Sequence, residues 1–213
     1  MHILGKKILF PPVETADENG LLAIGGDLSP ERLILAYKSG IFPWFNEGEP
    51  VIWYSPPERM VLFPKDLKVS KSMEKVLKSA NFRISFNKNF AEVIHHCKTI
   101  DRPGQQGTWI TREMQKAYIA LHELGYAKSV EVWQEDRLVG GLYGIDLGHI
   151  FTGESMFSLV SNASKVAFIY LNHILKEHNY LLLDCQVYNE HLASLGAVEI
   201  SRDVFMQYLI QEK

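Results

Sequence analysis

The sequence predicts an α+β protein in which a small N-terminal domain precedes a larger domain built on a mixed β-sheet. Two observations support this fold class. The first sixty residues are rich in turn-forming and aromatic residues and contain one clear helix pattern, whereas strand and helix patterns mix from Pro64 onward. A composition of 46% hydrophobic and 22% charged residues is typical of a globular chain that buries a substantial core. We expect domains of residues 1–62 and 63–213.

The expected N-terminal domain has one helix with clear boundaries. Ser29 is suited to the N-cap position and Pro30 to the first helical position, while Gly40 ends the pattern. The apolar face of this helix contains Leu33, Ile34, Ala36 and Tyr37. The following residues, 41–45, are too short and too proline-bound to form a central strand.

The second domain begins with one strand and two helices. Residues 82–86 alternate as in a strand, and residues 90–97 have a helical pattern. Thr111 caps the next helix. The apolar face of that helix contains Met114, Ala117, Tyr118, Leu121 and Leu124. Three strands are then predicted in quick succession, joined by short turns at Glu135-Asp136 and near Gly148. Their expected ranges are 128–134, 137–145 and 149–157.

A long amphipathic helix at 162–176 and a buried strand at 180–185 follow, with a short helix at 190–195 and a last strand at 198–200. This order of elements is typical of the N-acetyltransferase (GNAT) fold. In that fold the fourth and fifth strands separate and the acyl donor enters the gap. Those strands correspond here to residues 149–157 and 180–185, so we expect the functional site between them.

Three polar residues on these two strands are candidate catalytic residues. Asp184 and Gln186 lie two residues apart, so on a regular strand their side chains point to the same side. A carboxylate and a carboxamide placed together can hold and orient an amine between them. Glu154, on the neighbouring strand, is suited to attract a cationic acceptor or to help position its amine. Asp184 is compatible with either general-base or orienting chemistry.

The chain carries a net charge of −3, but the window from Lys65 to Lys88 carries +5. Lys71, Lys75 and Lys78 share one helical face within it, and Arg83 follows in the next strand. Such a face is commonly just solvated. A local basic patch on an acidic chain is also suited to bind a phosphate backbone without reading its sequence.

Several other functional classes are disfavoured by the sequence. No apolar run reaches the length of about 18 residues typical of a membrane span, and the N-terminus lacks a signal-peptide pattern. Two cysteines, Cys97 and Cys185, form no disulfide framework, which favours the cytoplasm. No cluster of ligands has zinc-like spacing. The stretch 156–162 lacks the glycines of an acetyl-CoA pyrophosphate loop, so coenzyme A is not expected as the donor.

A set of motifs in fixed order resembles the leucyl/phenylalanyl-tRNA–protein transferase family from about Asn19 to Arg202. Each motif is weak alone, but the ordered set is specific. The motifs are Gly20-Leu-Leu-Ala-Ile-Gly25-Gly26-Asp27-Leu-Ser-Pro30, Gly40-Ile-Phe42-Pro43-Trp44-Phe45, Trp53-Tyr-Ser55-Pro56, Gly107-Thr-Trp109-Ile-Thr111, Gly140-Gly-Leu-Tyr143-Gly144, Phe151-Thr-Gly-Glu154-Ser-Met156-Phe157-Ser158, Asn162-Ala-Ser-Lys165, Asp184-Cys-Gln186 and His191-Leu-Ala-Ser194-Leu-Gly196-Ala197.

The resemblance implies transfer of leucine or phenylalanine, and also methionine, from aminoacyl-tRNA to proteins that begin with arginine or lysine. Such transfer marks the acceptor for degradation by the N-degron route. The tRNA ester supplies the driving force, so no cofactor or metal is expected. The resemblance also favours tRNA binding by Lys71, Lys75, Lys78 and Arg83. We expect a cytoplasmic monomer. The predicted acyl pocket is apolar and contains Trp44, Trp109, Leu142, Phe151, Met156, Phe168 and Leu183.

Two alternatives remain at this point. A small-molecule N-acyltransferase can have the same fold, and binding of its acyl donor would distinguish it. The second alternative is a tRNA-binding module without catalysis, although the presence of Glu154, Asp184 and Gln186 argues against it.

Overall fold

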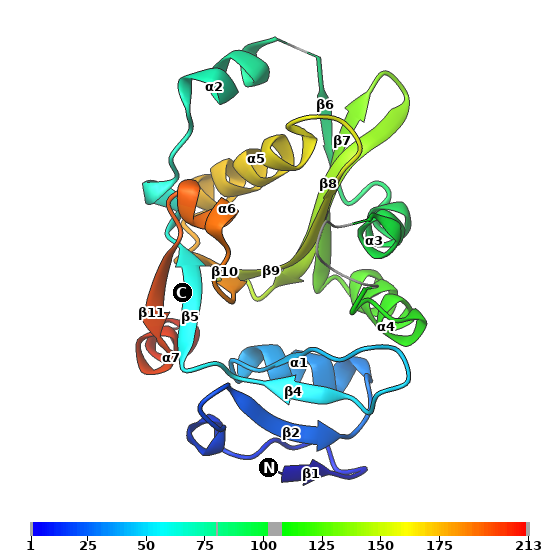
Figure 1. Ribbon diagram of the computed structural model, residues 1–213, viewed down its shortest axis with the longest axis vertical. Coiled ribbons are helices and arrows are strands. Elements are labelled where there is room, and N and C mark those ends of the chain that lie inside the picture. The colour runs from blue at the N-terminus through cyan, green and yellow to red at the C-terminus, as the bar shows by residue number, and fades with distance from the viewer. Residues whose placement is uncertain (1, 80, 102–107, 212–213) are drawn as a thin grey trace.

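The computed structural model describes residues 2–79, 81–101 and 108–211. Gly107, which opens one of the sequence motifs, lies outside these residues. The described chain contains a four-stranded sheet near the N-terminus and a seven-stranded sheet above it in the view of Figure 1.

The small sheet has the strand order β1-β2-β4-β3. Its strands are β1 (His2–Leu4), β2 (Leu21–Gly25), β3 (Phe42–Pro43) and β4 (Ile52–Tyr54). The two-residue β3 lies at an edge, where the absent N–H of Pro43 interrupts no ladder, as the sequence predicted. Helix α1 (Pro30–Lys38) begins directly after Ser29 and covers this sheet, and a short 3-10 turn, η1 (Val13–Thr15), precedes β2.

The large sheet has the order β11-β5-β10-β9-β8-β7-β6. It is mixed, because β10 pairs in parallel with β9 whereas its other neighbouring strands pair antiparallel. Its strands are β5 (Glu58–Leu62), β6 (Arg83–Phe86), β7 (Ala127–Gln134), β8 (Arg137–Asp146), β9 (Ile150–Ser158), β10 (Leu182–Gln186) and β11 (Val198–Ser201). The expected α+β class with a GNAT-like second part is therefore confirmed.

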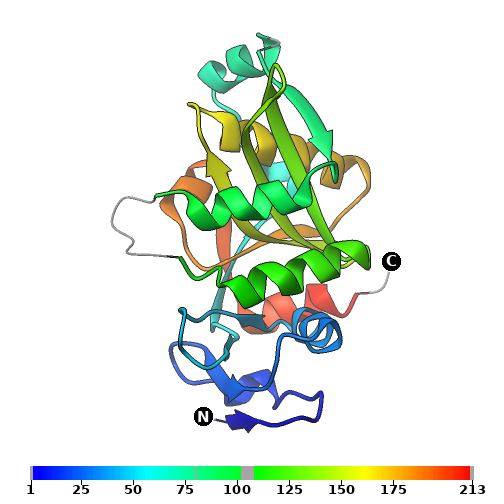
Figure 2. The same cartoon turned by 90° about the vertical axis from the view of Figure 1, so that its right-hand side faces the viewer.

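Helices cover both faces of the large sheet. Helices α3 (Phe90–Thr99) and α4 (Arg112–Glu123) cross one face side by side, and α5 (Ala163–Glu177) lies on the other (Figure 1, Figure 2). Helix α2 (Lys71–Lys78) stands at the end of the molecule farthest from the N-terminal sheet. Three short elements complete the chain: η2 (Pro64–Asp66), α6 (Glu190–Ser194) and α7 (Arg202–Leu209). Helix α7 was not predicted from the sequence.

The order of elements from β6 to β11 follows the sequence prediction, but the expected domain division does not coincide with the sheets. Residues 58–62, assigned to the first domain, form β5, which lies between β10 and β11 in the large sheet. We therefore propose that the boundary lies between β4 and β5. One hydrophobic cluster also joins the two parts, since it contains Trp53 of the small sheet and Tyr118 of α4. A second cluster lies under α5, on the opposite face.

The parallel pairing of β9 and β10 is short. Leu182, Leu183 and Asp184 pair with residues 150–152, after which a β-bulge shifts the register of β10. Strand β9 continues to Ser158, so the two strands separate after Thr152. This is the gap that the fold class predicted. Among the described residues, no helix is long and apolar enough to cross a bilayer.

Candidate active site

A cavity of about 830 Å³ lies at the gap between β9 and β10 and extends to the N-terminal part of the chain. Its walls come from β3, β4, β8, β9, β10, α5 and α6, so elements far apart in sequence meet around it. Six of the seven predicted acyl-pocket residues line it: Trp44, Trp109, Leu142, Met156, Phe168 and Leu183. The wall they form is largely apolar.

The seventh, Phe151, is not among the lining residues. It is 3% exposed and belongs to the core beneath α5. Its ring lies against the backbone of Gly144 on β8, where a Cβ atom would come within 2.4 Å of it. Leu171 of α5, which the sequence analysis did not select, lines the cavity together with Phe168.

Glu154 lies in the cavity wall and accepts three hydrogen bonds. Oε1 accepts from the hydroxyl of Tyr37 and from Nε2 of Gln186, both at 2.8 Å, and Oε2 accepts from the hydroxyl of Tyr118 at 3.1 Å. The two tyrosine hydroxyls also contact each other. With two hydrogen bonds on Oε1 and one on Oε2, the second oxygen keeps a lone pair that can accept from a bound substrate.

The pKa of Glu154 is raised to about 7. Burial is the main cause, because it disfavours the charged carboxylate, and the negative charge of Asp184 acts in the same direction. The three hydrogen bonds from Tyr37, Tyr118 and Gln186 oppose this shift. A carboxyl group with this pKa is suited to exchange a proton near neutral pH. The same environment raises the pKa of both tyrosines well above the usual range.

The expected alternation of Asp184 and Gln186 is broken by the β-bulge. Gln186 has a φ of +65°, a left-handed conformation that is uncommon for residues other than glycine. Its side chain lines the cavity and reaches Glu154, whereas Asp184 is fully buried and is not among the lining residues. The two side chains therefore do not share one face, because the regular period of two ends at the bulge.

Asp184 is instead paired with Arg59 of β5. Nε and Nη2 of Arg59 each donate to one carboxylate oxygen at 2.8 Å, which is a bidentate pair. The hydroxyl of Thr152 donates to Oδ2 at 3.1 Å, and the backbone N–H of Gln186 donates to Oδ1 at 2.9 Å. Each oxygen thus accepts two hydrogen bonds.

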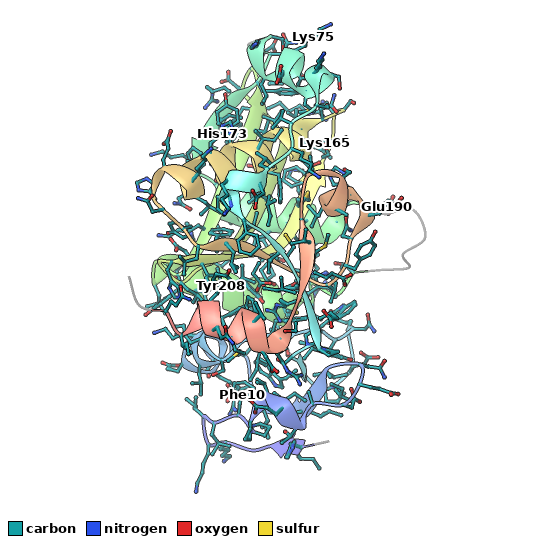
Figure 3. The ribbon with its side chains drawn as sticks, turned by 90° about the vertical axis from the view of Figure 1, so that its left-hand side faces the viewer. Phe10, Lys75, Lys165, His173, Glu190 and Tyr208 are labelled. Atoms are coloured by element: carbon teal, nitrogen blue, oxygen red, sulfur yellow. The ribbon has the colours of Figure 1, made fainter. Side chains whose placement is uncertain are left out.

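The predicted basic residues lie elsewhere. Lys71, Lys75 and Lys78 are exposed on α2, while Met73 on the opposite face is buried. Lys75 marks the end of the molecule in Figure 3. Arg83 is exposed on β6, where its guanidinium lies 5.1 Å from the ring centre of Trp133. None of the four lines the cavity.

Three important residues were not selected from the sequence as site residues: Tyr37, Tyr118 and Arg59. Both tyrosines were placed on apolar helix faces, and a buried tyrosine hydroxyl usually needs a partner, which was the available signal. Arg59 precedes the apolar run 60–63, and its carboxylate partner lies 125 residues away. Within the described residues, no three His, Cys, Asp or Glu side chains come together as a metal site.

Acyltransferases of the GNAT type receive their acyl donor where two central strands separate, and here that separation opens onto the cavity. The fold and the place of the site thus define a GNAT-type acyltransferase. The model of the leucyl/phenylalanyl-tRNA protein transferase family matches residues 61–210, and the model of its N-terminal domain matches residues 26–57. This chain is an enzyme that belongs to the leucyl/phenylalanyl-tRNA–protein transferase family.

Individual relatives agree with this assignment. A leucyl/phenylalanyl-tRNA–protein transferase of Flavobacterium johnsoniae is 65% identical over 209 residues, covering 98% of this chain and 99% of the relative. Among solved structures, a conserved protein of unknown function from Bacteroides thetaiotaomicron has a TM-score of 0.50 at 11% identity, covering 90% of this chain and 66% of that one. FemX has a TM-score of 0.49 at 11% identity, covering 85% and 71%. At 11% identity, the similarity to the Bacteroides thetaiotaomicron protein concerns the fold alone, and nothing is concluded from the similarity to FemX.

Proposed function

We propose that this protein transfers leucine, phenylalanine or methionine from aminoacyl-tRNA to the α-amine of proteins that begin with arginine or lysine, and thereby marks them for degradation by the N-degron route in the cytoplasm. Relatives that match nearly the whole chain are named leucyl/phenylalanyl-tRNA–protein transferases. The observation that carries the mechanism is the hydrogen-bonded Glu154 at the gap between β9 and β10, beside an apolar wall.

The apolar part of the cavity supports binding of the donor side chain. Leu142, Met156 and Leu183 come from three adjacent strands, and Phe168 and Leu171 add the face of α5. Methionine is flexible and adapts to different apolar shapes. Because one methylene group changes binding by only about 1–3 kcal/mol, such a pocket accepts leucine, phenylalanine and methionine together. A charged side chain would lose its hydration there without gaining a partner.

The reaction is aminolysis of an ester. The acceptor nitrogen forms a bond to the ester carbonyl carbon, and the bond from that carbon to the ribose oxygen breaks. Glu154, as a carboxylate, takes a proton from the amine through the free lone pair of Oε2. That proton is then available to the departing ribose oxygen, so the tRNA leaves with a free hydroxyl group. No redox step or external energy source enters this balance.

Gln186 is suited to orient the amine. One hydrogen of its Nε2 is used by Glu154, which leaves the carbonyl oxygen free to accept from the amine and the second hydrogen free to donate to the developing oxyanion. Asp184 contributes differently in this proposal. Its carboxylate oxygens are already occupied by Arg59, Thr152 and the backbone of Gln186, which supports indirect action through the position of Gln186.

The charge of the cavity supports a cationic acceptor. Two carboxylates, Glu49 and Glu154, are among its lining residues, and no lysine, arginine or histidine is found among those described. Glu49 is exposed and accepts hydrogen bonds from the backbone and side chain of Asn46. We assign Glu49 to bind the cationic side chain of the acceptor's N-terminal arginine or lysine, because Glu154 acts on the α-amine.

The basic residues support binding of the tRNA body. Lys71, Lys75 and Lys78 carry the charge of α2 outward. Lys165, at the start of α5, lies between Lys75 and Glu190 of α6 along the length of the molecule in Figure 3. A tRNA whose phosphate backbone is bound along this line would bring its 3′ end toward α6, whose Leu192 lines the cavity. Such contacts to phosphates carry no sequence preference.

The direct test uses leucyl-tRNA with a labelled leucine and a peptide that begins with arginine. We expect label to appear on the peptide, and much less on a matched peptide that begins with alanine. Glu154→Gln should lower the transfer rate without preventing donor binding. Absence of transfer by the folded wild-type protein to either peptide would contradict the proposed function.

A further inference from the structure

Arg59 occupies a buried position between the two parts of the chain. Arg59 belongs to β5, and the residue is 2% exposed. Besides the bidentate pair with Asp184, its Nη1 donates to the carbonyl oxygen of Gly40 at 3.2 Å. The guanidinium also lies 4.8 Å from the ring centre of Phe42 and 4.6 Å from that of Phe205. These contacts reach β3, β10 and α7 at once.

The contact with Asp184 leads to Gln186. Oδ1 of Asp184 accepts from the backbone N–H of Gln186, and this hydrogen bond holds the bulge at which Gln186 has a φ of +65°. A left-handed conformation costs about 1–2 kcal/mol in a residue with a Cβ atom, so it needs support from its surroundings. The bulge directs the Gln186 side chain to Oε1 of Glu154.

The contact with Gly40 leads to Tyr37. Gly40 follows α1 and has a φ of +73°, and Tyr37 lies on the last turn of this helix. The Tyr37 hydroxyl donates to the same oxygen, Oε1 of Glu154, at the same distance of 2.8 Å as Gln186 does. One guanidinium thus holds the two separate segments that supply both donors to Oε1.

We propose that Arg59 is a positioning residue of the active site, which sets the places of Gln186 and Tyr37 and thereby the hydrogen bonding of Glu154. This inference rests on the proposed roles of Glu154 and Gln186. Arginine is suited to the task because its planar fork can donate to Asp184 in a bidentate way and to Gly40 with a third nitrogen. The ammonium of lysine is a single point of charge and cannot reproduce this geometry.

Stability alone does not account for such a pair. Buried ion pairs can often be replaced by apolar residues of similar size with little loss of stability, because desolvation offsets the attraction between the charges. Loss of one partner is more damaging, since it leaves an unpaired buried charge. A test must therefore separate loss of folding from loss of positioning.

Arg32 provides a matched control. It is fully buried like Arg59 and also combines a carboxylate partner with backbone carbonyl acceptors: Nε pairs with Asp27 at 3.2 Å, and Nη2 donates to the carbonyl oxygens of Gly5 and Lys7. Unlike Asp184, Asp27 is exposed. It does not line the cavity. The experiment compares Arg59→Lys, Arg59→Met and Arg32→Met with the wild type. Arg59→Lys keeps the charge and provides a folded variant if Arg59→Met does not fold.

Two measurements are made on each variant. The first is single-turnover transfer from saturating leucyl-adenosine, a minimal 3′-end donor, to an arginine peptide, together with donor KM. The second is the titration of the Glu154 carboxyl group by ¹³C NMR, which does not depend on activity. The charged or titratable groups around Glu154 are Tyr37 from α1, Tyr118 from α4 and Asp184, with Arg59 behind it.

We expect Arg59→Lys to lower the transfer rate about 10²-fold, as a misplacement of about 1 Å does, while donor KM changes less than about twofold. In this variant the pKa of Glu154 should rise, because the hydrogen bonds that its carboxylate accepts from Tyr37 and Gln186 are weakened. Arg59→Met should raise the pKa of Glu154 further, because the negative charge of Asp184 then loses its cationic partner. Arg32→Met should lower the melting temperature and leave both the rate and the titration unchanged.

The inference is overturned if the Arg59 variants lose activity only in proportion to their melting temperature and their Glu154 titration matches that of the wild type. A different result would affect the proposed function instead. If the Glu154 titration moves in the Arg59 variants but Glu154→Gln and Gln186→Ala transfer at the wild-type rate, the positioning by Arg59 is supported and the catalytic roles are contradicted.

Discussion

Nε2 of Gln186 lies 2.8 Å from Oε1 of Glu154, and this hydrogen bond joins β10 to β9 just beyond the point where the two strands separate. A gap between strands is normally filled by water or by a ligand, because its backbone groups lack ladder partners. Here a side-chain amide and a carboxylate meet across it beside the cavity.

The first prediction concerns the pH dependence of transfer. If ionised Glu154 accepts the proton of the amine, the single-turnover rate should fall as the pH drops below about 7. Glu154→Gln should lower the rate by about 10²–10⁴-fold and remove this limb of the profile. The limb that belongs to the α-amine of the acceptor peptide should persist. An unchanged limb near pH 7 in Glu154→Gln would assign it to another group.

Stability should depend on pH through the same residue. The pKa of Glu154 in the folded protein, about 7, lies above the value of 4.5 that is usual for a glutamate side chain. The stability linked to its proton is therefore fully present below about pH 4.5 and is lost as the pH rises through about 7. Glu154→Gln removes this loss. We compare the free energy of unfolding in urea at pH 4 and pH 8. On going from pH 4 to pH 8, this free energy should change more favourably in Glu154→Gln than in the wild type, by about 1–3 kcal/mol. If the free energies of unfolding of variant and wild type differ by the same amount at both pH values, the raised pKa of Glu154 is contradicted.

The third prediction concerns the basic face of α2. Reversing Lys71, Lys75 and Lys78 to glutamate should raise KM for aminoacyl-tRNA and flatten its salt dependence, by about 0.7–0.9 in slope per lost phosphate contact. Transfer from leucyl-adenosine should stay nearly unchanged. Lys116→Glu is the matched control, because Lys116 is exposed on α4, across the sheet. Equal damage with both donors would mean that the α2 lysines support the fold.

The donor preference should depend on the cavity wall. Met156→Ala enlarges the pocket, so it should shift the kcat/KM ratio toward phenylalanine over leucine by about tenfold, measured with the two aminoacyl-adenosines. Phe151→Leu is the control, since Phe151 lies in the core and outside the lining. It should lower the melting temperature without changing the ratio. A change in the ratio for Phe151→Leu would support its place in the predicted pocket.

The fifth prediction concerns the acceptor. Glu49→Gln should raise KM for a peptide that begins with arginine by about 5–50-fold, because a charge-assisted hydrogen bond contributes about 1.5–3 kcal/mol before screening by solvent. KM for leucyl-adenosine should not change. Glu47→Gln serves as the control, because Glu47 is exposed in the same loop but is not a lining residue. Equal effects of the two substitutions would point to general charge rather than to direct contact.

Local patterns predicted much of this architecture. The helix at Pro30–Lys38, the helical face that contains Lys71, Lys75 and Lys78, the two hairpins from β7 to β9 and the order of elements from β6 to β11 follow from periodicity, caps and turns. These signals reside within a few residues of the element that they describe. Glu154 and Gln186 were also selected from the sequence, because their strands belong to the gap of a familiar element order. Their catalytic roles remain predictions.

Contacts between distant segments decided the remainder. Strand β5 joins the large sheet between β10 and β11, so the division into domains cannot be seen in composition alone. The pairing of Asp184 with Arg59 and the bulge at Gln186 reverse the expected strand alternation. A carboxylate in a short apolar strand has the same local pattern whether it faces a substrate or a buried guanidinium. Only the packing of β5 against β10 determines which of these it meets, because hydrogen bonding and desolvation depend on neighbours in space.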